Sequence, residues 1–151
     1  MMRLEEQIMF GDFVFGIHTA TTFLLTGMVW FAQIVHYPLL RYVPARAVAA
    51  FEQEHYRRAF RGASVLMAVE TASGVLLLSV RPETVPVEVI VISLALLGFG
   101  AVMTWGYCVP CHKALRQNPS TQLAKKLMQV NAWRTAAYTA RSVLLLFALV
   151  L

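Results

Sequence analysis

Four long apolar segments constrain the fold of this chain more than any other feature of its sequence. A helix needs about 20 apolar residues to cross the hydrocarbon core of a bilayer. Segments that reach or approach this length cover residues 13–35, 63–80, 87–109 and 133–151. Only 14% of the residues are charged, whereas about 25% is usual in soluble domains. The sequence therefore predicts an all-α fold, a four-helix transmembrane bundle that forms one integral membrane domain over residues 1–151.

The connection between the first two segments has an amphipathic pattern of its own. Within residues 44–61, one face at helical spacing is formed by Val48, Phe51, His55 and Ala59. Charged residues such as Glu54 and Arg57 lie elsewhere around the same helix. We expect an amphipathic helix that lies on the membrane surface and leads into the second span. Glu52 is interpreted as a solvated charge on this surface helix.

The distribution of basic residues indicates how the bundle is oriented. Most of them lie in the first and third connections, namely Arg41, Arg46, Arg57, Arg58, Arg61, Lys113, Arg116, Lys125 and Lys126. Because basic loops stay in the cytosol, we expect both termini outside it, in a bacterial inner membrane. The formal net charge of +5 does not indicate a nucleic-acid partner, since the charges fall between apolar runs. The expected partners are the lipid bilayer and either other membrane subunits or a second copy of the chain.

Two ionisable residues lie well inside the predicted spans. Glu70 is seven residues into the second span, and Arg141 lies seven residues beyond Arg134 in the fourth. At ~1.5 Å per helical residue, both are roughly 10 Å below the cytosolic boundary. An unpaired charge at that depth is costly, so we predict that Glu70 and Arg141 contact each other. Such a pair fits a structural lock between helices and a functional site equally well.

Three of the four histidines fall near the cytosolic boundary. His36 ends the first span, His55 lies on the surface helix and His112 follows the third span. Together with Glu70 they offer nitrogen and oxygen ligands for a transition metal, or axial ligands for haem. The predicted metal site therefore comprises His36, His55, Glu70 and His112. The alternative is that the histidines are hydrated or hydrogen-bonded residues of the membrane boundary.

Polar residues also recur at helical spacing along the first and fourth spans. Arginine presents its donors in a fixed geometry that suits an anionic or carbonyl group. We therefore assign the binding of an organic cofactor to Gln33, Asn131, Arg134 and Arg141. A quinone that enters laterally between helices is one candidate. Polar stripes are also ordinary contacts between membrane helices, and packing is the alternative explanation.

Residues 108–112 read Cys-Val-Pro-Cys-His, which matches the attachment sequence for c-type haem. That attachment takes place on the outer side of the membrane, whereas the predicted topology places Cys108 and Cys111 in the cytosol. Covalent haem at these two cysteines is therefore not expected. A redox dithiol or a soft-metal role for the two thiols stays open.

The combined spacing of several polar and aromatic residues resembles that of small, uncharacterised bacterial four-helix integral membrane proteins. The matching residues are Trp30, Gln33, His36, Tyr37, Pro38, Phe51, His55, Arg58, Met67, Glu70, Pro110, His112, Leu115, Asn131, Trp133, Arg134, Thr135 and Arg141. The resemblance spans most of the chain and implies the fold and the membrane location, but no activity. The chain departs from the pattern at Cys108 and Cys111, and at Tyr138, where tryptophan is expected.

Two classes of function are consistent with these features. The first is a small membrane oxidoreductase, or a protein that binds a metal, haem or quinone at a polar intramembrane site near the cytosolic face. The second is a non-catalytic accessory or assembly subunit of a larger membrane complex, in which the polar stripes are docking surfaces. The sequence does not decide whether the chain is an enzyme.

Overall fold

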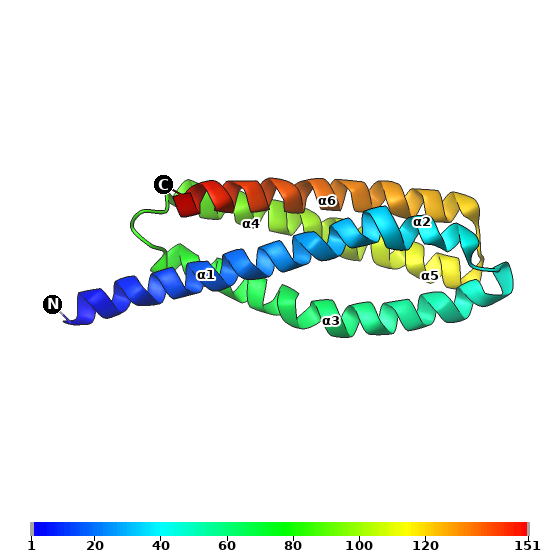
Figure 1. The fold of residues 1–151 in the computed structure, drawn as a ribbon, viewed down its shortest axis with the longest axis horizontal. Helices are drawn as coiled ribbons and strands as arrows, with labels where there is room; N and C mark the ends of the chain where they lie inside the picture. The colour runs from blue at the N-terminus through cyan, green and yellow to red at the C-terminus, as the bar shows by residue number, and fades with distance from the viewer. Residues whose placement is uncertain (1, 151) are drawn as a thin grey trace.

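The protein is a bundle of four long helical rods (Figure 1). The computed structural model describes the backbone of residues 2–150 and the side chains of residues 5–150. The elements are α1 (Met2–Phe31), η1 (Ala32–His36), α2 (Tyr37–Leu39), η2 (Leu40–Tyr42), α3 (Ala45–Val80), α4 (Val87–Val102), η3 (Met103–Cys108), α5 (Val109–Gln117) and α6 (Thr121–Val150). No strand occurs in this range. The predictions of an all-α fold and of four long helices are confirmed.

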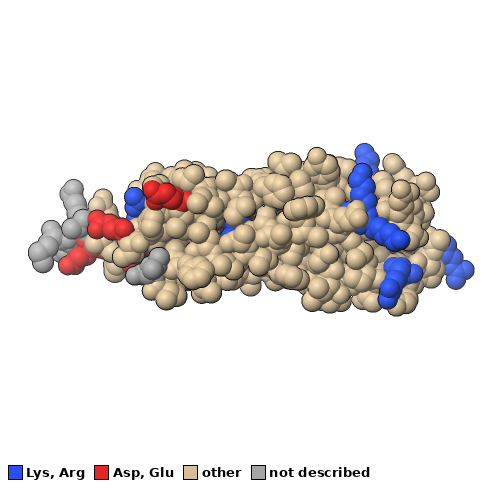
Figure 2. All heavy atoms as spheres, turned by 90° about the horizontal axis from the view of Figure 1, so that it is seen from above, with Lys and Arg blue, Asp and Glu red and all other residues tan. Residues whose placement is uncertain are grey.

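The rods run antiparallel, with both termini at one end of the bundle and two of the three connections at the other (Figure 1). Three rods are long and apolar enough to cross a membrane, at Glu5–Tyr42, Ala45–Val80 and Val87–Gln117. The rod formed by α6 is not among them, because Arg134 and Arg141 lower the hydropathy of its apolar half. Lysines and arginines gather toward one end and acidic residues toward the end with the N-terminus (Figure 2). The structure therefore keeps the charge asymmetry on which the predicted orientation rests.

The segment predicted as a separate surface helix is the first half of α3. This helix continues without a break for 36 residues, so residues 45–61 and 63–80 belong to one rod and no separate helix precedes residues 63–80. Its inner face packs against α1 and α5. The interpretation of Glu52 as a solvated charge is wrong, because the side chain is completely buried in the bundle.

Two prolines, Pro38 and Pro110, lie inside continuous helical rods. Before Pro38 and before Pro110, the backbone widens into the π-helical segments η1 and η3. Proline has no N–H to donate and its ring clashes with the preceding turn, so the turn widens instead of breaking. The N–H of Tyr37 bonds to the carbonyl of Ala32, five residues back. π-Helical turns often occur at functional sites, and both of these adjoin the candidate site described below.

Glycines set how closely α1 and α3 approach each other. A Cβ atom at Gly11 would lie 2.3 Å from the backbone oxygen of Val80, and one at Gly74 would lie 2.8 Å from the His18 ring. The two helices therefore touch closely in the half of the bundle that carries the termini. A buried apolar cluster fills the rest of this half, formed by Val14, Phe15, Leu77, Val85, Ile90, Leu145 and Ala148.

Candidate functional site

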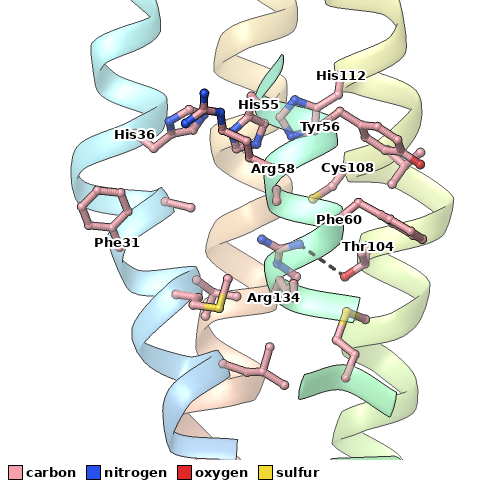
Figure 3. A pocket seen from close by; sticks show the side chains of 18 of the residues that line it. Phe31, His36, His55, Tyr56, Arg58, Phe60, Thr104, Cys108, His112 and Arg134 are labelled. Carbon is pink, nitrogen blue, oxygen red and sulfur yellow. Dashed lines mark hydrogen bonds between the residues drawn. The ribbon is translucent and has the colours of Figure 1, made fainter. Parts of the chain in front are cut away.

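A pocket of about 800 Å³ opens in the basic half of the bundle, where α1 and α3 no longer touch closely (Figure 3). Its walls come from α1, α3, η3 and α5, and α6 contributes two residues behind them. Most of the lining is apolar or aromatic, including Leu24, Met28, Phe31, Phe60, Met67 and Trp105. Pockets of this size and character hold small organic ligands in many proteins.

Three histidines meet at the basic end of this pocket (Figure 3). His36 comes from η1, His55 from α3 and His112 from α5. The His36 and His55 rings stack with centroids 4.0 Å apart, and the His55 and His112 centroids are 5.0 Å apart. The structure thus brings together three of the four residues predicted for the metal site. Within the described residues, however, no group of three or more His, Cys, Asp or Glu side chains is arranged to hold a metal ion.

Glu52 is the acidic partner of this histidine cluster. His112 Nδ1 donates to Glu52 Oε2 at 2.5 Å, and the Tyr37 hydroxyl lies 3.4 Å from His112 Nε2. Glu52 Oε1 and His36 Nε2 are both buried and have no hydrogen-bond partner among the described residues. Sequence reasoning left Glu52 out of the site as a solvated charge, although its helical phase with Glu70 places it on the inner face of α3. The cluster therefore retains unused hydrogen-bonding capacity in a buried position.

Arg134 extends from α6 into the middle of the pocket (Figure 3). Its guanidinium donates to Asn131 Oδ1 at 2.6 Å and to Thr104 Oγ1 at 3.4 Å, while its Nε has no partner in the part of the chain that the structure describes. Asn131 in turn donates to Gln33 Oε1 at 2.8 Å. The structure therefore links Gln33, Asn131 and Arg134, which are three of the four residues predicted for a cofactor.

Glu70 and Arg141 form the predicted ion pair. Arg141 donates to Glu70 Oε1 at 2.7 Å, and both side chains are completely buried. Thr22 and Tyr138 also donate to the Glu70 carboxylate, at 3.0 and 3.3 Å. A buried pair of this kind is stable when further hydrogen bonds satisfy its remaining atoms, as they do here. The structure confirms the predicted contact.

The ion pair lies apart from the histidine cluster. Glu70 follows His55 by 15 residues on the same helix, a distance of about 22 Å. It cannot ligate the same ion as the histidines, so the structure does not bring Glu70 into the predicted metal set. Arg141 pairs with Glu70, so it does not belong to the hydrogen-bonded group that Gln33, Asn131 and Arg134 form.

A hydrogen-bonded network extends from the ion pair away from the pocket. Arg141 Nε donates to Ser93 Oγ at 3.3 Å, and His18 Nε2 lies 3.5 Å from the same oxygen. His18 Nδ1 donates to the carbonyl oxygen of Glu70 at 3.1 Å. Tyr138 connects this network to the pocket, because it lines the pocket and also donates to Glu70.

An exposed charge cluster lies at the rim of the pocket. Arg57 and Arg58 bind the Glu54 carboxylate, with distances of 2.7 and 2.6 Å from their Nε atoms. The rim arginine Arg58 therefore already has a counter-charge.

Both cysteines are buried and free. Cys108 lines the pocket at the end of η3, whereas Cys111 belongs to an apolar cluster with Leu115 and Leu127.

Comparison of the chain with models of known protein families, with curated proteins and with solved structures finds no match. The function must therefore be argued from the geometry of the pocket and of the two buried charge clusters.

Proposed function

We propose that the chain is an integral membrane protein that takes up a lipophilic ligand from the bilayer and holds the ligand's polar head group in the pocket. The head group would lie among Arg134 and the three histidines, and the apolar part would contact the walls formed by α1, α3 and η3. The observation that carries the proposal is a large, mostly apolar pocket that contains an arginine with an unused donor. Such a combination of apolar walls and few convergent polar groups is typical of ligand pockets.

The proposed location is a bacterial inner membrane with both termini outside the cytosol. The charge asymmetry between the two ends of the bundle supports this orientation. In this orientation the histidine cluster and Arg134 lie near the cytosolic face. The ligand would enter sideways between α1 and α3, where exposed Leu24 and Phe60 adjoin the pocket.

Three cofactor classes remain proposals within this function. A quinone fits the apolar walls and could accept hydrogen bonds from Arg134 and from a histidine. A transition metal or haem would need the histidines to rotate, since the His36 and His55 rings now stack. An oxidoreductase role depends on finding one of these three groups bound to the protein.

The experiment that tests the proposal is the analysis of what co-purifies with the protein from its native membrane. Organic extraction and mass spectrometry of the detergent-purified protein should find a lipophilic molecule in near-stoichiometric amount. An absorption spectrum and elemental analysis on the same sample would detect haem or a metal.

A pocket-filling variant supplies the control. Ala63 lines the pocket, whereas Val65 is exposed and does not. Ala63→Trp should abolish the co-purifying molecule, and Val65→Trp should retain it. A folded wild-type protein without any such molecule would overturn the proposal and favour a non-catalytic accessory subunit, identified by co-purifying membrane proteins.

A further inference from the structure

Arg134 is a partly buried cation that forms no ion pair with any described side chain. The ion pairs between described side chains join Arg57 and Arg58 to Glu54, His112 to Glu52 and Arg141 to Glu70. None of them involves Arg134. Its hydrogen-bond partners, Asn131 and Thr104, are both neutral.

Arg141, on the same helix, has the counter-charge that Arg134 lacks among the described residues. Arg141 lies two turns further along α6 and has Glu70 at 2.7 Å. An ionised group in apolar surroundings costs several kcal/mol unless it is paired. The guanidinium cannot escape this cost by losing its proton, because arginine stays charged in proteins. An anion bound to the guanidinium of Arg134 would neutralise this charge.

Exposed aromatic residues indicate the depth of Arg134. Trp30, Trp105 and Trp133 are 44%, 50% and 66% exposed. Tryptophan on a membrane protein's outer surface concentrates at the boundary between hydrocarbon and head groups. Trp133 and Trp105 are the sequence neighbours of Arg134 and of its partner Thr104. Arg134 thus lies at the level where lipids carry their charged groups.

The shape of the pocket fits a molecule in which a hydrocarbon chain is attached to a charged group. The pocket is lined from His36 and Phe31 down to Leu24 and Leu25. The 12 residues from Leu24 to His36 correspond to about 18 Å along a helix. Away from the histidines the walls are mostly apolar, with Ser64, Thr104 and Tyr138 as polar exceptions.

We propose that the ligand is an anionic amphiphile, whose carboxylate or phosphate binds Arg134 and whose hydrocarbon chain fills the apolar part of the pocket. This inference rests on the proposed function and specifies its ligand. A neutral quinone would accept a hydrogen bond from Arg134 but would leave its charge uncompensated. An anion accepts two parallel bonds from the guanidinium and neutralises it. A free fatty acid and a phosphate-bearing lipid share this chemistry.

The test uses a quenching probe and a background that carries Trp30→Phe and Trp133→Phe, in which Trp105 of the pocket wall is the remaining tryptophan. Purified protein in neutral detergent is titrated with 9,10-dibromostearate and, separately, with its methyl ester, while tryptophan fluorescence is recorded. The two probes have the same chain and differ in charge. The wild-type protein should bind the acid at least about tenfold more tightly than the ester, since a charge-assisted hydrogen bond has that effect.

Three variants assign the preference to Arg134. Arg134→Gln should remove the preference for the acid, and Arg134→Lys should retain part of it. Arg58→Gln is the matched control, because Arg58 lines the rim but is already paired with Glu54, and it should retain the full preference. If Arg134→Gln does not fold, the ratio between acid and ester in Arg134→Lys still tests the inference.

The outcomes separate this inference from the function on which it rests. Equal binding of acid and ester by the wild-type protein would overturn the anionic ligand while leaving a lipophile pocket intact. Binding of neither probe, together with no co-purifying lipophile, would overturn both. Extraction from the native membrane distinguishes the two sources, since a free fatty acid and a phosphate-bearing lipid differ in mass and in phosphorus content.

Discussion

Glu52 and Glu70 lie on the same face of α3 and are both completely buried. They are 18 residues apart, which corresponds to about five helical turns. Glu52 binds His112 of α5, and Glu70 binds Arg141 of α6. The residues of α3 that line the pocket, from Phe51 to Met67, fall between or beside these two carboxylates. The two pairs therefore hold α3 at both ends of the pocket.

Removing the carboxylate of Glu70 should destabilise the bundle strongly. Glu70→Gln leaves Arg141 buried without a counter-charge, which typically costs about 3–5 kcal/mol. We expect a large fall in the thermal unfolding midpoint in detergent. The double variant Glu70→Leu with Arg141→Met should recover much of the loss, because it removes both charges. Equal midpoints for Glu70→Gln and the wild type would contradict the assignment of a structural lock.

Glu52 and Glu54 should respond very differently to the same substitution. Glu52→Ala removes the buried partner of His112 and creates a cavity, so we expect a loss of about 1–3 kcal/mol or more in stability. Glu54→Ala removes an exposed ion pair and should change the unfolding midpoint little. Thermal unfolding of the two variants side by side provides the measurement. A similar small effect for both would mean that Glu52 is hydrated in the protein after all.

Close approach of α1 and α3 predicts sensitivity at two glycines. Gly11→Ala would place a methyl group against the backbone of Val80, and Gly74→Ala would place one against His18 and Leu94. Overpacking of this kind costs about 1–3 kcal/mol. Gly62→Ala is the control, since nothing lies within 4 Å of a Cβ there. It should be neutral or slightly stabilising in a helix. Unfolding midpoints in detergent that are equal for the three variants would contradict the close contact.

The proposed orientation can be tested with single cysteines introduced into a background that lacks Cys108 and Cys111. Thr84→Cys lies in the turn between α3 and α4, and Ser120→Cys lies before α6. A membrane-impermeant thiol reagent on intact cells should label Thr84→Cys, and should label Ser120→Cys only after the membrane is opened. The reverse pattern would invert the topology and place residues 108–112 on the side where haem is attached.

Depth along the predicted spans was enough to anticipate the buried contact between Glu70 and Arg141. Each charge needed a partner, and each was the only charge of its sign at that level. The convergence of His36, His55 and His112 followed in the same way, because all three lie near one end of the predicted spans. Depth could not show how the rings are oriented, and they stack instead of converging on one point.

Helical phase was less informative in the first half of α3. The inner face of residues 45–61 is amphipathic, and this pattern does not distinguish a helix on a membrane surface from one that packs against other helices. Glu52 was misinterpreted for this reason, although Glu54, two residues further, is exposed and solvated. The sequence pattern also did not reveal that the helical rods continue past Pro38 and Pro110 through π-helical turns.

The apolar cluster around Leu77 and Ile90 lies between the His18 network and the end of the bundle that carries the termini. The chain of polar groups from the pocket through Tyr138 to His18 therefore stops before that end. Hydrogen bonds between described residues thus connect Glu70 with the pocket through Tyr138, whereas the side of the network that faces the termini is filled by apolar side chains.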